Sequence, residues 1–123
     1  MAKVLVVDDS RFTRTMLRGM LYSFGHEVVG EAENVPQAIE SYKSLKPEVV
    51  TLDLVLPGGS GIDVLKTIRQ ESADAKVIVV TASGQEQVDE QVLELGAFAV
   101  LHKPFTADEF KSIVQSALGL SRG

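Results

Sequence analysis

Short apolar runs rich in β-branched residues alternate along this chain with longer segments of helical periodicity. Such runs occupy residues 4–7, 49–52 and 77–80, and each is apolar on both faces. Strands have this composition when helices cover both sides of their sheet. A weaker run at 98–101 and a mixed run at 27–31 complete the set. We place the mixed run at an edge of the sheet, where a strand is covered less completely.

Amphipathic segments lie between these runs. The first begins after Ser10, a good N-terminal cap, and ends near Gly25, and we expect Phe12, Met16, Leu17, Met20 and Leu21 on its inward face. The others are marked by Asn34 with Pro36; by Ile62, Leu65 and Ile68; by Val88, Val92 and Leu95; and by Thr106 with Phe110, Ile113, Val114 and Leu118. Five strands alternating with five helices predict an α/β fold, a doubly wound five-stranded parallel sheet with helices on both faces.

Length and composition narrow the possible functions. A chain of 123 residues fits one domain, so we expect residues 1–123 to form a single unit. The formal net charge of -5 argues against a nucleic-acid partner, which needs a concentrated basic face. The sequence contains no cysteine, which excludes disulfides and thiolate metal sites. We find neither a membrane-spanning run nor a secretion signal, and therefore expect a cytoplasmic protein that does not bind a membrane.

Polar groups follow four of the predicted strands. Asp8 and Asp9 follow the first, Asp53 the third, Thr81 the fourth and Lys103 the fifth. Ligands of such sheets bind beyond the carboxyl ends of the strands, so we expect these side chains in one crevice. Three neighbouring carboxylates repel one another unless a cation lies among them, and an all-oxygen ligand set suits Mg²⁺. The combination predicts a phosphoryl-transfer site with a carboxylate nucleophile.

Each of these residues also has a purely structural interpretation. Asp9 could cap a helix, Asp53 could be a turn residue, Thr81 could cap the next helix, and Lys103 could belong to a plain loop. Taken singly, each structural interpretation is the better one. Taken together they are weaker, because four strand ends each place a chemically matched group at one rim of the sheet.

With these motifs in order, the chain resembles the receiver domains of response regulators, in particular the stand-alone CheY-like members. The matching motifs are Val-Asp-Asp at 7–9, the Asp53 segment with Leu56-Pro57 and Gly61, Thr81-Ala82, and Lys103-Pro104-Phe105. The resemblance extends from residue 3 to about residue 118. It implies a flavodoxin-like fold with the strand order 2-1-3-4-5.

The resemblance also implies a role for each acidic residue. Asp53 is the expected phosphoacceptor, and Asp8, Asp9 and Asp53 are expected to hold Mg²⁺, with Asp8 acting through water. The backbone carbonyl of Val55 is expected to supply a further metal ligand. The expected phosphodonor is a phosphohistidine on a separate sensor histidine kinase.

Three further residues are expected to contact the phosphoryl group. Thr81 would close on it, Lys103 would bond its oxygens, and the small Ala82 would leave room for it. The Lys103–Pro104 peptide bond is expected to be cis, which proline permits. Val55 and Ser83 flank the site and could tune slow self-catalysed phosphorylation and dephosphorylation.

The family pattern is broken where many members carry an aromatic ring, three residues before the lysine. Val100 occupies that position and cannot change between buried and exposed states as a ring does. Phe98 should face the same side of the strand, and we treat it as a possible replacement for the switch ring. His102 alternates with core positions and could contact a helix, whereas His26 lies at a turn. Neither histidine has a neighbour at metal-ligand spacing.

The expected output is binding to another protein. The fourth helix carries Glu86, Asp89, Glu90 and Glu94, which form either a solvated face or an acidic docking surface. We expect the unidentified target at the face formed by the fourth helix, the fifth strand and the fifth helix. The leading pathway is chemotaxis, which commonly uses stand-alone receivers.

Four other functions compete with this interpretation. A haloacid dehalogenase-type phosphohydrolase would carry Asp-x-Asp after its first strand, where this chain has Asp8-Asp9-Ser10. A flavodoxin-like cofactor binder would need a Ser/Thr/Gly-rich phosphate loop in the same place. A phosphate sink or relay, or a receiver that only docks partners without turnover, remains an open alternative.

Overall fold

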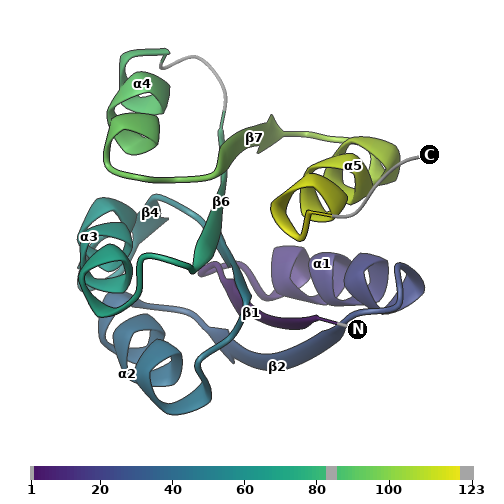
Figure 1. Cartoon of the computed structure of the whole chain (residues 1–123), viewed down its shortest axis with the longest axis horizontal. Coiled ribbons are helices and arrows are strands. Elements are labelled where there is room, and N and C mark those ends of the chain that lie inside the picture. Colours follow the sequence, from purple (N-terminus) through teal and green to yellow (C-terminus); the bar gives the residue numbers. More distant parts are fainter. Residues whose placement is uncertain (1, 83–85, 120–123) are drawn as a thin grey trace.

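The computed structural model describes residues 2–82 and 86–119. Its main sheet has five parallel strands in the order β2-β1-β3-β6-β7 (Figure 1). These strands are β1 (Lys3–Val7), β2 (Glu27–Ala32), β3 (Val49–Leu52), β6 (Lys76–Ala82) and β7 (Ala99–Lys103). Counted along the chain, they give the predicted order 2-1-3-4-5, with the mixed strand β2 at an edge. The α/β fold predicted from the sequence is therefore confirmed.

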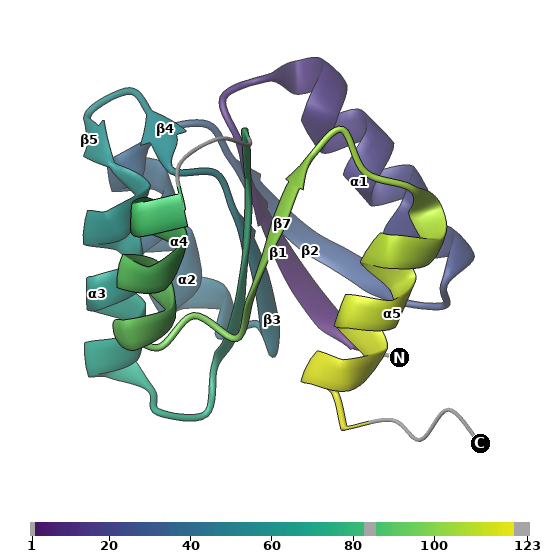
Figure 2. The same cartoon turned by 90° about the horizontal axis from the view of Figure 1, so that it is seen from above.

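The helices cover both faces of the sheet, as Figure 2 shows. They are α1 (Arg11–Ser23), α2 (Val35–Leu45), α3 (Gly61–Glu71), α4 (Glu86–Glu94) and α5 (Ala107–Ala117). The predicted caps are present: Ser10, Asn34 and Thr106 each accept a hydrogen bond from a backbone N–H three residues later. Gly25 and Gly96 follow α1 and α4 with φ of +89° and +106°, which glycine adopts without strain. In the described part of the chain, no helix is long and apolar enough to cross a bilayer.

Two apolar layers hold the helices to the sheet. The layer beneath α2, α3 and α4 contains Val50 and Leu52 of β3 and Leu65 of α3, and the layer beneath α1 and α5 contains Val6 of β1 and Phe110 of α5. All five side chains are fully buried. Burying each such side chain contributes about 1.5–3 kcal/mol, so the strands are fixed tightly and their carboxyl ends form a rigid rim.

One local expectation from the sequence is wrong, and one small element was not predicted. Phe12 does not lie on the inward face of α1, since it is 78% exposed. It is five residues from the buried Leu17, which places it about 140° away around the helix axis. A small antiparallel hairpin, β4 (Val55–Leu56) with β5 (Gly59–Ser60), also precedes α3 unpredicted, because strands of two residues leave no periodic signal.

Thr51 on β3 offers a test of the packing. Its side chain is 1% exposed, and its hydroxyl has no hydrogen-bond partner among the described residues. Burying an unpaired hydroxyl costs about 1–3 kcal/mol, and valine has nearly the same shape. We expect Thr51→Val to raise the free energy of unfolding by about 1 kcal/mol, measured by urea denaturation. If Thr51→Val were destabilised instead, the hydroxyl of Thr51 would have a hydrogen-bond partner in solution.

Candidate functional site

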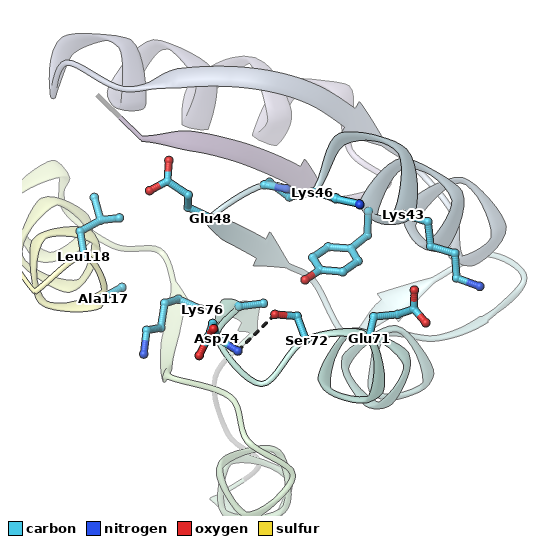
Figure 3. A pocket seen from close by; sticks show the side chains of 12 residues that line it. Lys43, Lys46, Glu48, Glu71, Ser72, Asp74, Lys76, Ala117 and Leu118 are labelled. Atoms are coloured by element: carbon cyan, nitrogen blue, oxygen red, sulfur yellow. Dashed lines mark hydrogen bonds between the residues drawn. The ribbon is translucent and has the colours of Figure 1, made fainter.

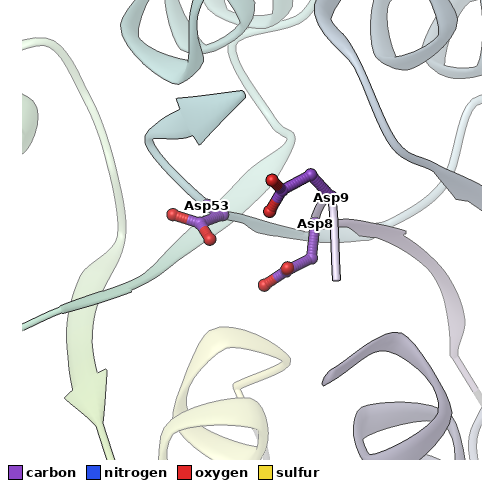
Figure 4. A group of neighbouring side chains, drawn as sticks. All are labelled: Asp8, Asp9 and Asp53. Carbon is purple, nitrogen blue, oxygen red and sulfur yellow. The ribbon is translucent and has the colours of Figure 1, made fainter. Parts of the chain in front are cut away.

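Three carboxylates meet at the carboxyl ends of β1 and β3. Asp8 and Asp9 directly follow β1, and Asp53 directly follows β3. One carboxylate oxygen from each lies within 4.8 Å of the others, and Figure 4 shows the group. Asp8 and Asp53 are buried, whereas Asp9 is exposed. The rule that residues at the carboxyl ends of parallel strands meet at one edge, called the strand-end rule below, therefore predicted this cluster correctly.

Lys103, the last residue of β7, bridges the two buried carboxylates. Its Nζ lies 2.9 Å from Oδ2 of Asp8 and 2.9 Å from Oδ2 of Asp53. The other oxygen of each carboxylate accepts a backbone N–H, from Ser10 at 2.8 Å and from Val55 at 3.1 Å. One ammonium thus faces two buried carboxylates and the exposed Asp9 near them, which leaves the cluster with excess negative charge.

Two groups of this cluster, Asp8 and Lys103, have shifted pKa values. Burial raises the pKa of Asp8 above its ordinary value, and the Asp53 charge adds to this, although hydrogen bonds from Lys103 and Ser10 act in the opposite direction. Burial alone would lower the pKa of Lys103, but its bonds to Asp8 and Asp53 outweigh this and raise the pKa. A carboxyl with a raised pKa gains from a further cation. The all-oxygen donor set and this deficit of positive charge fit a hard divalent ion.

The loop that carries Asp8 and Asp9 is fixed by Arg14 of α1. The guanidinium Nη1 donates to the backbone carbonyl of Asp8 at 2.7 Å, and Nε lies 3.0 Å from Oε1 of Glu31 on β2. Arg18 contacts the other oxygen of Glu31 at 2.7 Å. The Asp8–Asp9 peptide is therefore held from outside the cluster, a role that the strand-end rule could not find.

The backbone under Asp53 is fixed by Gly61, the first residue of α3. The N–H of Gly61 donates to the carbonyl of Leu54 at 2.9 Å. A Cβ atom added at Gly61 would lie 2.6 Å from Cα of Leu54 and would overlap the carbonyl oxygen of Asp53. Only glycine lets the helix approach this closely, so Gly61 sets the position of the central carboxylate.

Comparison with known proteins places the chain in a family. The sequence model of the response regulator receiver domain family matches residues 4–115 of this chain. The chain belongs to the receiver-domain family.

Curated relatives match this receiver over nearly their whole length. It is 40% identical to the chemotaxis protein CheY of Bacillus subtilis over 116 residues, which cover 94% of this chain and 97% of the relative. It is 43% identical to the chemotaxis protein CheY of Thermotoga maritima over 103 residues, covering 84% and 86%.

Solved structures agree with the fold of this receiver. A chain of the CheX–CheY–BeF3–Mg complex from Borrelia burgdorferi aligns with a TM-score of 0.91 and 32% identity, covering 95% of this chain and 89% of that one. The response regulator domain of Thermotoga maritima CheB aligns with a TM-score of 0.89 and 31% identity, covering 98% of each chain.

The remaining predicted residues of the receiver site lie at the same rim. Thr81 is buried near the end of β6, and Ala82 follows it with an exposed side chain. The side chain of Val55 is 74% exposed. The predicted cis peptide bond between Lys103 and Pro104 is present. The prediction for Ser83 lies outside the described residues.

Phe98 lies far from the switch residues of the site. It precedes β7, its backbone N–H donates to the carbonyl of Val77, and its ring lies 5.8 Å from Nζ of Lys76. Lys76 begins β6 and Thr81 lies five residues later, which separates the two by about 16 Å along the strand. The role of Phe98 as a switch ring stays a hypothesis that this position does not favour. Val100 is partly buried against the layer beneath α2, α3 and α4.

The acidic residues of α4 do not all face solvent. Glu90 and Glu94 are exposed, but Oδ2 of Asp89 lies 2.7 Å from Nε2 of His102 on β7. The expectation that His102 could contact a helix is therefore confirmed. The prediction for the Glu86 side chain lies outside the described part of the structure.

One pocket of the described structure lies away from the site, at the opposite end of the sheet. It has a volume of about 570 Å³ and lies near the starts of β3 and β6 (Figure 3). Its charged lining residues are Lys43, Lys46, Lys76, Glu48, Glu71 and Asp74. Acids and bases are balanced there, and none of the predicted site residues lines it. The chemistry is therefore concentrated at the carboxyl ends of the strands.

Proposed function

We propose that this protein is a phosphorylation switch of a two-component chemotaxis pathway, with Asp53 as its phosphoacceptor. The observation that carries the proposal is the close approach of Asp8, Asp9 and Asp53, with Lys103 bonded to the two buried carboxylates. Receiver membership supports the two-component role. The chemotaxis role is supported by the relatives named chemotaxis protein CheY, which match over almost their full length.

Mg²⁺ is the proposed cofactor. Asp8, Asp9 and Asp53 would hold it, together with the carbonyl of Val55, and this set contains only the oxygen ligands that Mg²⁺ prefers. When bound, the ion supplies positive charge that neutralises the phosphoryl oxygens. The raised pKa of Asp8 supports the proposal, since the cost of burying its charge outweighs the hydrogen bonds from Lys103 and Ser10.

The proposed reaction is phosphoryl transfer from a phosphohistidine of a sensor kinase. A carboxylate oxygen of Asp53 forms a bond to phosphorus while the phosphorus–nitrogen bond of the donor breaks, and the electron pair stays on the imidazole, which then takes a proton. Lys103 and Thr81 stabilise the charge of the transferred group, and Ala82 leaves space for it. The protein catalyses at most its own phosphorylation and later hydrolysis.

Output is proposed to pass through a protein partner. The proposed docking face combines α4, β7 and α5, where Glu90, Glu94, Asp108 and Glu109 present acidic side chains to solvent. Such a face would favour a partner with a basic surface.

Phosphorylation is tested by intact mass spectrometry after incubation with acetyl phosphate. We expect the mass increase of one phosphoryl group in Mg²⁺, no increase in EDTA, and none for Asp53→Asn in Mg²⁺, because an amide is a poor nucleophile. Asp74→Asn, at an exposed aspartate away from the site, should be phosphorylated like the wild type.

Two results of this experiment would contradict parts of the proposal. If the wild type acquires no phosphoryl group and calorimetric titration shows no Mg²⁺ binding, the chain is a receiver that only docks partners. If Asp53→Asn is phosphorylated as fast as the wild type, Asp53 is not the acceptor.

A further inference from the structure

A polar contact between α4 and β7 lies next to the site but takes no part in the proposed chemistry. Oδ2 of Asp89, the fourth residue of α4, lies 2.7 Å from Nε2 of His102. Nε2 of His102 makes no regular hydrogen bond, and the two side chains attract one another as opposite charges when the imidazole is protonated. Both side chains are partly buried, so water screens the contact incompletely.

The contact borders the residues that handle the phosphoryl group. In the β6–β7 ladder His102 is the partner of Thr81, and the next residue after His102 is Lys103. Asp89 lines a groove of about 260 Å³ together with Thr81 and Ala82. A displacement of Thr81 or Lys103 would therefore change the distance between Asp89 and His102.

Few apolar side chains hold α4 in place. Val92 is its one fully buried residue among the side chains described, 87–94, and Val88 is partly buried. Helices with few buried apolar contacts open or shift at low free-energy cost. A single polar contact is then a sizeable part of what fixes α4 against the sheet.

Phosphorylation must disturb the hydrogen bonds of Asp53. A phosphoryl group bonds to one of its two carboxylate oxygens, and each of them already accepts a hydrogen bond, from Lys103 or from the N–H of Val55. The new phosphoryl oxygens also attract Lys103. The arrangement in which Lys103 bonds Asp8 and Asp53 directly therefore belongs to the unphosphorylated protein, and the residue next to Lys103 in β7 is His102.

We propose that the Asp89–His102 contact is a latch that holds α4 against β7 in the unphosphorylated protein and opens when Asp53 is phosphorylated. Asp89 and His102 are then positioning residues, which act through Thr81 and Lys103. The latch supplies a reporter of phosphorylation in a chain whose Val100 has no ring to move. The inference rests on the proposed phosphorylation of Asp53.

The latch is tested by the affinity for beryllofluoride with Mg²⁺, a stable analogue of the phosphoryl group. A latch that favours the unphosphorylated state opposes binding of the analogue, and removing it must strengthen binding by the same coupling free energy. We expect Asp89→Asn and His102→Gln each to bind beryllofluoride about fivefold more tightly than the wild type in titrations followed by NMR. The double variant should bind no more tightly than either single variant, because both remove the same contact.

Glu90→Gln is the matched control. It removes one negative charge from the same helix at an exposed residue, and its affinity should equal that of the wild type. If Glu90→Gln also strengthens binding, the effect is one of general charge and the latch is refuted.

Hydrogen exchange of α4 separates a latch from a merely structural contact. In the wild type, beryllofluoride should speed the exchange of α4 amides, whereas in Asp89→Asn exchange should be fast already and change little. If Asp89→Asn binds the analogue with wild-type affinity and α4 exchanges faster by the same factor in both states, the contact is only structural. If the wild type binds no beryllofluoride at all, the proposed function fails and the latch fails with it.

Discussion

Replacing Gly61 with alanine should destabilise the protein and nearly abolish phosphorylation. The added Cβ would meet backbone atoms of Asp53 and Leu54, which cannot rotate away as a side chain can. Either α3 or the end of β3 must move, and overpacking against fixed backbone costs about 3 kcal/mol. Because Asp53 itself is displaced, the rate of phosphorylation by acetyl phosphate should fall about 100-fold even where the variant is folded. Urea denaturation and the time course of intact mass measure the two effects.

Gly19→Ala provides the matched control for this substitution. Gly19 lies within α1, and no atom comes within 4 Å of the position that its Cβ would take. Alanine is favoured over glycine inside a helix, so this variant should gain about 1 kcal/mol of stability and keep its phosphorylation rate. If Gly61→Ala loses stability while Gly19→Ala gains it, the close approach of α3 to the backbone of Asp53 is the cause of the loss. A Gly61→Ala variant with wild-type stability and rate would mean that α3 can shift without moving Asp53.

The residues at strand ends could be predicted from the sequence because two strong regularities determine them. Apolar runs locate the strands, and parallel strands bring the residues at their carboxyl ends to one rim. Asp8, Asp53 and Thr81 directly follow such runs, Lys103 lies two residues after one, and the structure places all four at one rim. Predicting that these residues share one rim therefore requires no knowledge of side-chain geometry.

Other features depended on details that periodicity does not contain. Phe12 is apolar and near the helical spacing, yet it faces solvent because its angle around α1 differs from that of Leu17. Arg14 reaches the Asp8 carbonyl from a helix, through a side chain whose direction the sequence does not specify. The pairing of Asp89 with His102 joins elements whose relative position only the folded sheet defines.

Asp8→Asn should make the metal-free protein more stable while removing its response to Mg²⁺. Burial raises the pKa of Asp8, so in the folded state its ionised form is disfavoured relative to the unfolded chain. At a pH below the ordinary pKa of 3.8, Asp8 is protonated in the folded and the unfolded state, so its burial does not lower the free energy of unfolding through ionisation. As the pH rises through 3.8 toward the raised pKa, the unfolded chain loses its proton first, and the wild type loses stability. The stability difference in favour of Asp8→Asn should therefore appear across this range and persist at neutral pH in EDTA.

Mg²⁺ should reverse this order of stability. A ligand that binds only the folded state stabilises it by about 2.7 kcal/mol at a free concentration about 100 times its dissociation constant. The wild type should gain this in urea denaturation, whereas Asp8→Asn, which lacks one carboxylate of the site, should gain far less. Asp74→Asn should follow the wild type in both conditions, because Asp74 is exposed and lies outside the cluster. If Asp8→Asn responded to Mg²⁺ as strongly as the wild type, Asp8 would not belong to the metal site. If it were less stable than the wild type in EDTA, the bond from Lys103 would outweigh the cost of burying the Asp8 charge.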